Sequence, residues 1–167
     1  MSVAMQRDVG AYILAVGASN PIVLNSSVGG DEAEINGFSI DRELVTPGQS
    51  LQLSCQAAVQ YSYSLAAAKV VVLHYNMQHS SAASSWLDYA DKDGSTRTER
   101  TVGTTASTGA QTGNGTLRSN FDLSGAKRYV RLQIEADFTG AATDDMDIGS
   151  MIVFGGYDTT PASTAGV

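Results

Sequence analysis

His74 and His79 are the two histidines of the chain, and their spacing argues against a shared metal ion. They lie five positions apart in a segment that we expect to be a β-strand, so their side chains point to opposite faces of the sheet. The usual zinc site needs three or four ligands that converge on one point. We therefore expect both histidines to have structural roles.

Two acidic segments resemble fragments of calcium-binding loops, in which oxygen ligands alternate along a turn. They are Asp91–Gly94 (DKDG) and Asp144–Asp147 (DDMD). Neither segment has the full set of ligands, which includes a distal bidentate carboxylate. We favour the alternative that both are solvated turns, and we predict no metal site.

The sequence lacks the common motifs of catalysis. No serine lies in a nucleophile elbow, no glycine-rich loop ends in Gly-Lys-Ser, and Gly155-Gly156 lacks a following helix that could hold a phosphate. Cys55 is the only cysteine, so neither a disulfide nor a thiolate metal cluster can form within one chain. In the alternating run from Leu51 to Val59 it takes an inward position, where a free thiol acts as a small apolar filler. We predict no catalytic residue, no cofactor and no enzymatic activity.

Aromatic residues offer one other possible binding chemistry, because flat rings can stack on sugars. The candidates for such a platform are Tyr61, Tyr63, Tyr75, Trp86 and Tyr89. At period-two spacing, however, aromatic side chains more often belong to the core of a β-sandwich. The exposure of these rings distinguishes the two interpretations.

The clearest element is a strand from Tyr129 to Phe138, in which apolar and polar residues alternate. One face is apolar, and its members are Val130, Leu132, Ile134, Ala136 and Phe138. Residues 51–63 and 69–79 predict two further long strands, which we expect to pair as antiparallel neighbours. Leu65–Ala68 could form a helical turn between them, although alanine alone is a weak signal. In the second of these strands one face is predicted to hold Val71, Leu73, Tyr75 and Met77.

The other elements have shorter signals. A first strand is expected to end at Gly17, and a short extended segment begins at Pro21. Asn36-Gly37 predicts a two-residue hairpin. Residues 101–116 consist almost wholly of Thr, Ser, Gly, Ala, Gln and Asn without a charge, which predicts a long exposed loop. The last strand is expected over residues 148–154.

The composition describes a neutral, polar surface on a protein with a sizeable core. The 167 residues are 43% hydrophobic and only 16% charged, and they carry a net charge of -7. This charge argues against direct binding of nucleic acid, which depends on clustered Lys and Arg. No segment has the length and apolar character of a signal peptide or a membrane span, so we expect synthesis in a cytoplasm and no membrane contact.

Several short strands separated by turns predict an all-β fold, an antiparallel β-sandwich of jelly-roll type with one long low-complexity loop. We expect a single domain over residues 1–160 and a flexible tail over residues 161–167. Because such a fold must cover its edge strands, we also expect an oligomer.

Five segments together resemble small virion structural proteins of tailed bacteriophages, of the capsid decoration (cement) type. They are residues 35–42 (INGFSIDR), Met77–Ser80 with Trp86–Tyr89, residues 122–131 (DLSGAKRYVR) and Phe154–Gly156. The resemblance implies a non-enzymatic protein that binds the outside of an assembled capsid, often as a homotrimer, with the major capsid protein as its partner. It implies that the protein stabilises the shell, with modest contacts strengthened by multiplicity.

Charged residues at strand ends are candidates for contact with a partner, because the rest of the surface has little charge. They are Asp41, Arg42, Lys127 and Arg128. The alternative is that they form ordinary exposed pairs, each contributing less than about 1 kcal/mol.

Two other classes of function remain open from the sequence. The protein could be a tail tube or tail-associated virion protein, with the low-complexity loop docking an adjacent ring in a hexamer. It could also be a carbohydrate-binding module, in which Trp86 and the tyrosines are exposed. Ring size and aromatic exposure would separate these alternatives from a decoration protein.

Overall fold

The computed structural model describes residues 14–25, 33–43, 53–90, 98–104, 109–139 and 143–155. The acidic turn at Asp91–Gly94, the expected C-terminal tail and the predicted domain boundary lie outside these ranges. Within them the regular elements are all strands, and no helix is long and apolar enough to cross a membrane. The prediction of an all-β protein is confirmed.

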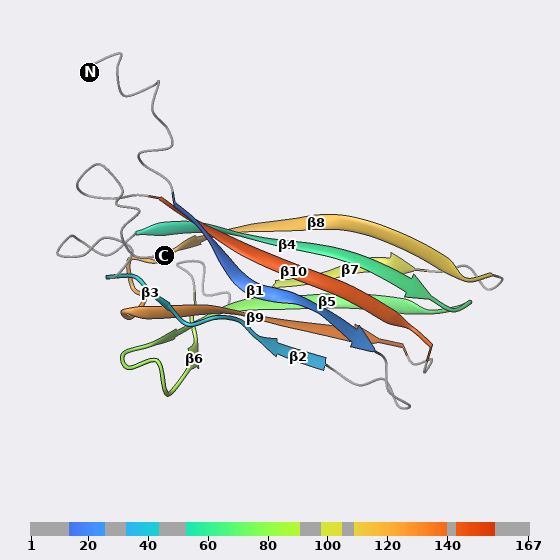
Figure 1. Cartoon of the computed structure of the whole chain (residues 1–167), viewed down its shortest axis with the longest axis horizontal. Helices are drawn as coiled ribbons and strands as arrows, with labels where there is room; N and C mark the ends of the chain where they lie inside the picture. The colour runs from blue at the N-terminus through green and yellow to red at the C-terminus, as the bar shows by residue number, and fades with distance from the viewer. Residues whose placement is uncertain are drawn as a thin grey trace, which may run out of the picture.

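The strands form two antiparallel sheets that pack face to face (Figure 1). Sheet A contains, in spatial order, β1 (Leu14–Asn25), β10 (Asp145–Gly155), β4 (Ser54–Leu65) and β8 (Gln111–Asp122). Sheet B contains β2 (Ala33–Asn36), β9 (Tyr129–Phe138), β5 (Val70–Ser80) and β6 (Leu87–Asp88). In sheet B, β3 (Ile40–Asp41) also pairs with β9, and β7 (Thr98–Thr104) also pairs with β5.

The connectivity is that of a jelly roll. The pairs β1–β10, β2/β3–β9, β4–β8 and β5–β7 are nested in the sequence, as in one long hairpin. Rolling this hairpin brings β10 beside β4 in sheet A and β9 beside β5 in sheet B. The result is a four-stranded sheet packed on a six-stranded sheet, which matches the predicted jelly-roll sandwich.

The core lies between the sheets and follows the predicted alternation. Every second residue of β9 is buried, from Val130 to Phe138, with exposed fractions of at most 1%. The predicted inner face of β5 is also confirmed, because Val71, Leu73, Tyr75 and Met77 are buried. Cys55 is buried beside Ala57 and Val59, as expected of an apolar filler, whereas Leu53 is exposed.

The expected pairing of the two long strands β4 and β5 is wrong, because the strands belong to different sheets. The chain crosses from sheet A to sheet B between Leu65 and Val70. No helical turn forms here, and Ala68 instead has a left-handed φ of 57°. The crossing allows the inward faces of both strands to contribute to one core.

The first strand is longer than predicted. It does not end at Gly17 but runs through Pro21 to Asn25, with irregularities in its pairing to β10 between Gly17 and Ser19 and between Ser19 and Ile22. Because these irregularities absorb the breaks that Gly17 and Pro21 suggest, β1 is a single edge strand.

The hairpin predicted at Asn36-Gly37 is also wrong. β2 and β3 lie one after the other along β9 and do not pair with each other. The Gly37 N–H donates to Leu132 O (2.9 Å), and the Phe38 N–H donates to Ala18 O (2.7 Å). A Cβ atom at Gly37 would lie 2.5 Å from Ala18 O and 2.6 Å from Leu132 O. Glycine is therefore required because the segment passes closely between the two sheets, and not because it turns.

Most of the predicted low-complexity loop forms strands. Residues 101–104 belong to β7 and residues 111–116 to β8, while 105–108 lie outside the described ranges. The reason lies in β4, whose Tyr61 and Tyr63 stand opposite Gly115 and Gly113 in the register. Side chains at these glycines, or at Gly103 of β7, would collide with the tyrosine rings. The small residues thus make room for aromatic side chains supplied by another strand.

Candidate interaction surfaces

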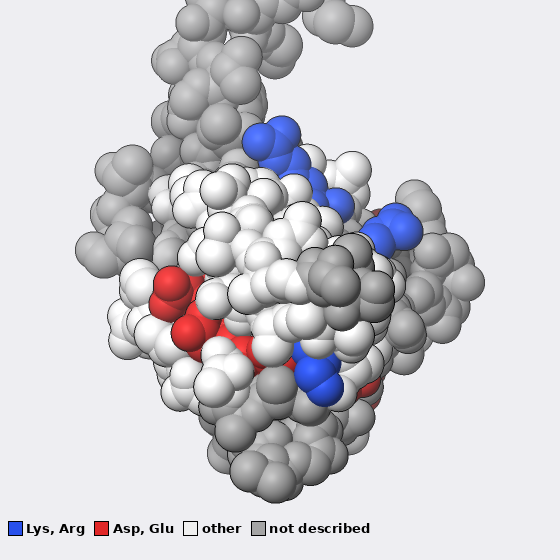
Figure 2. Space-filling model, turned by 90° about the vertical axis from the view of Figure 1, so that its right-hand side faces the viewer, with Lys and Arg blue, Asp and Glu red and all other residues white. Residues whose placement is uncertain are grey.

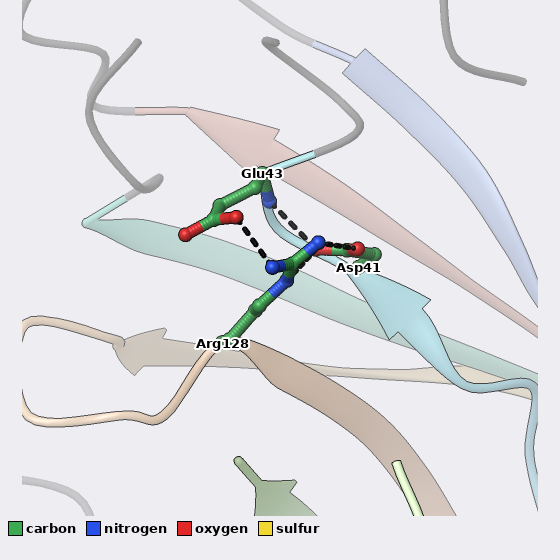
Figure 3. Close-up of polar contacts among 3 residues, drawn as sticks. All are labelled: Asp41, Glu43 and Arg128. Atoms are coloured by element: carbon green, nitrogen blue, oxygen red, sulfur yellow. Dashed lines mark hydrogen bonds and ion pairs between the residues drawn. The ribbon is translucent and has the colours of Figure 1, made fainter. Parts of the chain in front are cut away.

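The predicted partner-contact residues come together where β3 ends and where the turn after β8 enters β9. Arg128 donates from Nε to Asp41 Oδ1 (2.9 Å) and from Nη2 to Asp41 Oδ2 (2.7 Å). Its Nη1 lies 2.7 Å from Glu43 Oε2, so one guanidinium bridges two carboxylates (Figure 3). The hydrogen bond to Asp41, aided by both negative charges, raises the pKa of Arg128. The cluster fixes the β3 end against β9.

Arg42 differs from its neighbours because its side chain is buried, with an exposed fraction of 1%. Nη1 donates to Ala126 O (2.7 Å) and Lys127 O (3.0 Å), and Nη2 donates to Leu123 O (3.0 Å). Burial lowers the pKa of this guanidinium, although nearby Tyr89 and Cys55 oppose the shift. The expectation that Arg42 is a surface charge is therefore wrong: it holds the turn of residues 123–127 in place. Partner contact by Asp41, Lys127 and Arg128 stays a prediction, and Lys127 is exposed.

The same turn contacts His79 on β5. The Lys127 N–H donates to His79 Nδ1 (3.3 Å), and the imidazole packs at a tilt against the ring of Tyr89, with 5.2 Å between centroids. Burial lowers the pKa of His79, with further contributions from Lys127 and Arg42. His74 lies on the other face of β5, opposite Glu135 in the register. In the described part of the chain, no three His, Cys, Asp or Glu residues are grouped to hold a metal ion.

The second acidic segment is not wholly a solvated turn. Asp144 is buried, and its Oδ1 accepts a hydrogen bond from the Ala66 N–H at 2.7 Å. It thereby joins the start of β10 to the crossing between β4 and β5.

Figure 2 shows the end of the sandwich where β10 begins. Uncharged residues dominate this end, apart from a short acidic strip and scattered basic side chains.

The aromatic residues do not form one exposed platform. Tyr75 and Tyr89 are buried in the core, and Tyr61 and Tyr63 lie half-buried on the inner face of sheet A. Trp86 is half-buried, and the Arg131 guanidinium lies 4.6 Å from the centroid of its ring. The core interpretation is confirmed for Tyr75 and Tyr89, which removes them from any sugar-stacking surface.

Trp86 belongs to a polar network that the chain builds over the outer face of sheet B. Arg131 Nε donates to Gln78 Oε1 (2.8 Å), and Gln78 Nε2 donates to Asp88 Oδ1 (2.9 Å). Asn76 Nδ2 donates to the same Asp88 oxygen (2.7 Å). Because the segment that carries Trp86 and Asp88 covers β5 here, Asn76 and Gln78 are buried although they face away from the core.

The outer face of sheet A is a surface that the sequence interpretation missed. Its residues alternate with the buried positions of four long strands, and most are small or uncharged. They include Ala15, Gly17 and Val23 of β1; Asp145, Asp147, Gly149, Met151 and Val153 of β10; Ser54, Gln56, Ala58, Gln60, Ser62 and Ser64 of β4; and Thr112, Asn114, Thr116, Arg118 and Asn120 of β8.

The charged members of this face lie away from its middle. Met151 and Val23 are 44% and 53% exposed. Met151 has Gly17 and Ala58 as its cross-strand neighbours, so its side chain stands on a surface of small residues. Arg118 is on the edge strand β8, and Asp145 and Asp147 are at the start of β10. The sequence does contain a signal for this neutral face, which is the uncharged composition of the outward positions that alternate with the core residues.

A shallow hollow of about 610 Å³ lies on the same face around Gly149, which has no side chain to fill it. Its rim combines the apolar Val23 with hydrogen-bonding groups of Gln60, Asn114 and Thr116. Ser62 donates to Asp147 Oδ2 at 3.2 Å across the hollow. The hollow is polar enough to hold a hydroxylated ligand and open enough to receive a protein side chain.

No protein-family model and no curated protein matches the sequence. Among solved structures, the chain is similar to a chain in the structure of infectious bursal disease virus, Gt strain. The identity is 16% and the TM-score 0.43, over 90% of this chain and 33% of the viral chain. It is similar to T=1 particles derived from infectious bursal virus, with 13% identity and a TM-score of 0.44 over 90% and 33%. Lectin I-B4 of Griffonia simplicifolia, in its metal-free form, has 8% identity and a TM-score of 0.40 over 88% and 94%.

The chain thus spans about a third of the viral chains that it resembles. Viral particle proteins are among the similar structures, and so is a plant lectin. Identities and TM-scores this low assign neither a family nor a function.

Proposed function

We propose that this protein is a non-enzymatic virion structural protein that decorates the outside of a tailed-bacteriophage capsid and stabilises the shell. Its partner is the major capsid protein, and it acts as an oligomer, for which the sequence resemblance implies a homotrimer. It is made in the host cytoplasm and resides on the capsid exterior. It contacts neither nucleic acid nor membrane directly.

The observation that carries the proposal is the neutral outer face of sheet A. The centres of protein interfaces are depleted in charged residues and enriched in residues such as Met. The Ala, Gly, Ser and Val side chains of this face lose little rotamer entropy when they are covered. Met151, exposed among small residues, is placed to insert into a pocket of the partner.

Copy number is the first test of this proposal. Quantitative mass spectrometry of purified particles should give a ratio to the major capsid protein near one, or a fixed simple fraction of one. A few copies per particle would contradict decoration and favour a tail location, and absence from particles would contradict both virion assignments.

A substitution in the neutral face tests the proposed contact itself. Met151→Lys should abolish or strongly weaken co-sedimentation with undecorated capsids, because the interface would have to bury an unpaired charge. Leu87→Lys is the matched control, since Leu87 is also exposed (55%) but lies on β6 of sheet B. Equal binding by both variants would show that sheet A does not contact the capsid, and circular dichroism would verify that both are folded.

The hollow around Gly149 supports a second candidate, which is binding of a glycan. Sugars need converging hydrogen-bond donors and acceptors beside an apolar surface, and Asn114, Asp147 and Val23 provide this combination. Asn114→Ala should then abolish glycan-array binding, whereas Trp86→Ala should not, because Trp86 lies over sheet B. Failure of the wild-type protein to bind any glycan would remove this candidate.

A further inference from the structure

The four sheet edges of this sandwich differ in how they are protected from strand pairing. β1 contains Pro21, which lacks an N–H donor, and has two pairing irregularities. β2 and β3 are only four and two residues long and are separated by the segment at Gly37. On the remaining edge of sheet B, β6 has only two residues. The register of β7 against β5 shifts between Val71 and Val72 of β5. Short strands, proline and bulges are the usual devices against edge-to-edge association.

The edge of sheet A formed by β8 has none of these devices. Twelve consecutive residues, from Gln111 to Asp122, pair with β4 without a shift. The strand contains no proline, and β8 is the outermost strand of sheet A, with no further strand beside it among the described residues (Figure 1). An edge of this length is twice the usual strand.

We propose that β8 pairs with β8 of a second copy of this chain, in antiparallel orientation, about a two-fold axis at Thr116. Two sheets A would then join into one continuous eight-stranded sheet. An antiparallel strand pair of identical chains is self-complementary, as a two-fold interface requires. This pairing goes beyond the proposed function and does not depend on it. A two-fold pair gives a dimer, or two trimers joined through their β8 edges where the homotrimer that the sequence resemblance implies also forms.

The side chains of β8 select this register. With Thr116 opposite itself, Leu117 of one chain lies opposite Gly115 of the other, on the inner side of the sheet. Gly115 is the position over which the half-buried Tyr61 ring extends, so the incoming Leu117 would cover apolar surface at the open margin of the core.

The same register places Arg118 opposite Asn114, on the outer side. A register centred on Arg118 would set two like charges face to face, which destabilises a strand pair. A register centred on Leu117 would place Ser119 opposite Gly115 and leave the glycine position poorly filled. The register about Thr116 therefore places Leu117 opposite Gly115 on both sides of the axis without a charge conflict, and it sets Ser119 opposite Gly113.

Single cysteines on the outer side of β8 test the pairing in the full-length protein. Thr116→Cys should give an interchain disulfide on mild oxidation, because directly opposed Cβ atoms lie roughly 5 Å apart. Asn120→Cys is the matched control, since the two copies of this residue would be separated by about eight residues, or roughly 27 Å. The native Cys55 is buried and should not interfere. A disulfide at position 120 but not at 116, or at neither, would overturn the proposal.

Charge exchange provides an independent test that separates loss of pairing from loss of folding. Thr116→Lys and Thr116→Asp should each weaken dimerisation by about fivefold or more in analytical ultracentrifugation, because like charges would then meet at the axis. Mixing the two variants should restore dimers. A monomeric wild type, or variants that dimerise alone as well as together, would overturn the pairing without affecting the test of capsid copy number.

Discussion

Arg42 joins the end of β3 to the turn before β9 through three hydrogen bonds to backbone carbonyls. It differs from Arg128, whose side chain is 40% exposed and whose guanidinium engages carboxylates. A buried charge that donates hydrogen bonds to carbonyls is costly to remove, because its partners stay buried and lose their donor. The two arginines therefore have unequal roles, although both were grouped with the same surface cluster in the sequence.

Arg42→Met should lower the free energy of unfolding by about 3 kcal/mol, through loss of donors to buried carbonyls. Lys127→Ala, in the same turn but at an exposed side chain, should change it by less than about 0.5 kcal/mol. Urea denaturation of the three proteins measures both effects. Similar losses in the two variants would contradict a special role for Arg42.

His79 should make stability depend on pH. Its pKa in the folded protein is below the ordinary value of 6.5, so the unfolded chain binds the proton more readily. Stability should therefore fall as pH decreases below about 6.5, because protonation favours unfolding. His79→Gln, which keeps a hydrogen-bond acceptor but cannot become charged, should reduce the slope of unfolding free energy between pH 7 and pH 5. An unchanged slope would show that acidic side chains, and not His79, account for the pH dependence of the unfolding free energy.

The burial of Arg42 had a weak signal in the sequence. Ile40 and Arg42 share a face of the extended segment, and Ile40 is a core residue. The charge of Arg42 nevertheless suggested a surface position. Only the folded turn brings together the three carbonyl oxygens that accept its hydrogen bonds. Local periodicity can place a side chain on a face, but it cannot show what lies opposite.

At the level of elements, strands whose own residues supply the apolar face were predictable. β9 is the clearest case, because its alternation is complete and each inward residue is apolar and buried. β8 was missed because its inward positions at Gly113 and Gly115 are filled by tyrosines from β4. The pairing of β4 with β5 was predicted wrongly, because alternation shows which residues of a strand face the core but not which strand lies beside it. These two strands face each other across the core and are not neighbours in one sheet.

Gly37 provides a prediction at this scale, since it lies where the chain bridges both sheets. Gly37→Ala should destabilise the protein by about 2 kcal/mol, because the new methyl group would meet two backbone carbonyls that cannot move independently. Gly149→Ala is the matched control: a Cβ atom there meets nothing within 4 Å, so the effect should be about neutral. Thermal unfolding monitored by circular dichroism would compare them, and equal melting temperatures would contradict the close approach at Gly37.

At the level of the whole molecule, the two outer faces of the sandwich are unlike. The face of sheet B carries Glu34, Glu135, Arg131 and Asp137 and is partly covered by the chain's own segment at Trp86. The face of sheet A is uncovered among the described residues, and its middle is neutral. The free β8 edge lies on the same sheet. Sheet A therefore carries both surfaces for which we propose contacts, the neutral outer face and the β8 edge.

Salt distinguishes the neutral face from the charged cluster of Asp41, Lys127 and Arg128 as the site of capsid contact. Exposed charge pairs are screened at high ionic strength, whereas contacts between uncharged surfaces are not. Binding through sheet A should therefore change by less than about threefold between low and high salt. Co-sedimentation with undecorated capsids across a sodium chloride series measures this. The contact would lie at the charged cluster instead if binding fell steeply with salt and if Lys127→Ala, but not Met151→Lys, removed this salt dependence. Only a contact through the cluster depends on attraction between exposed charges.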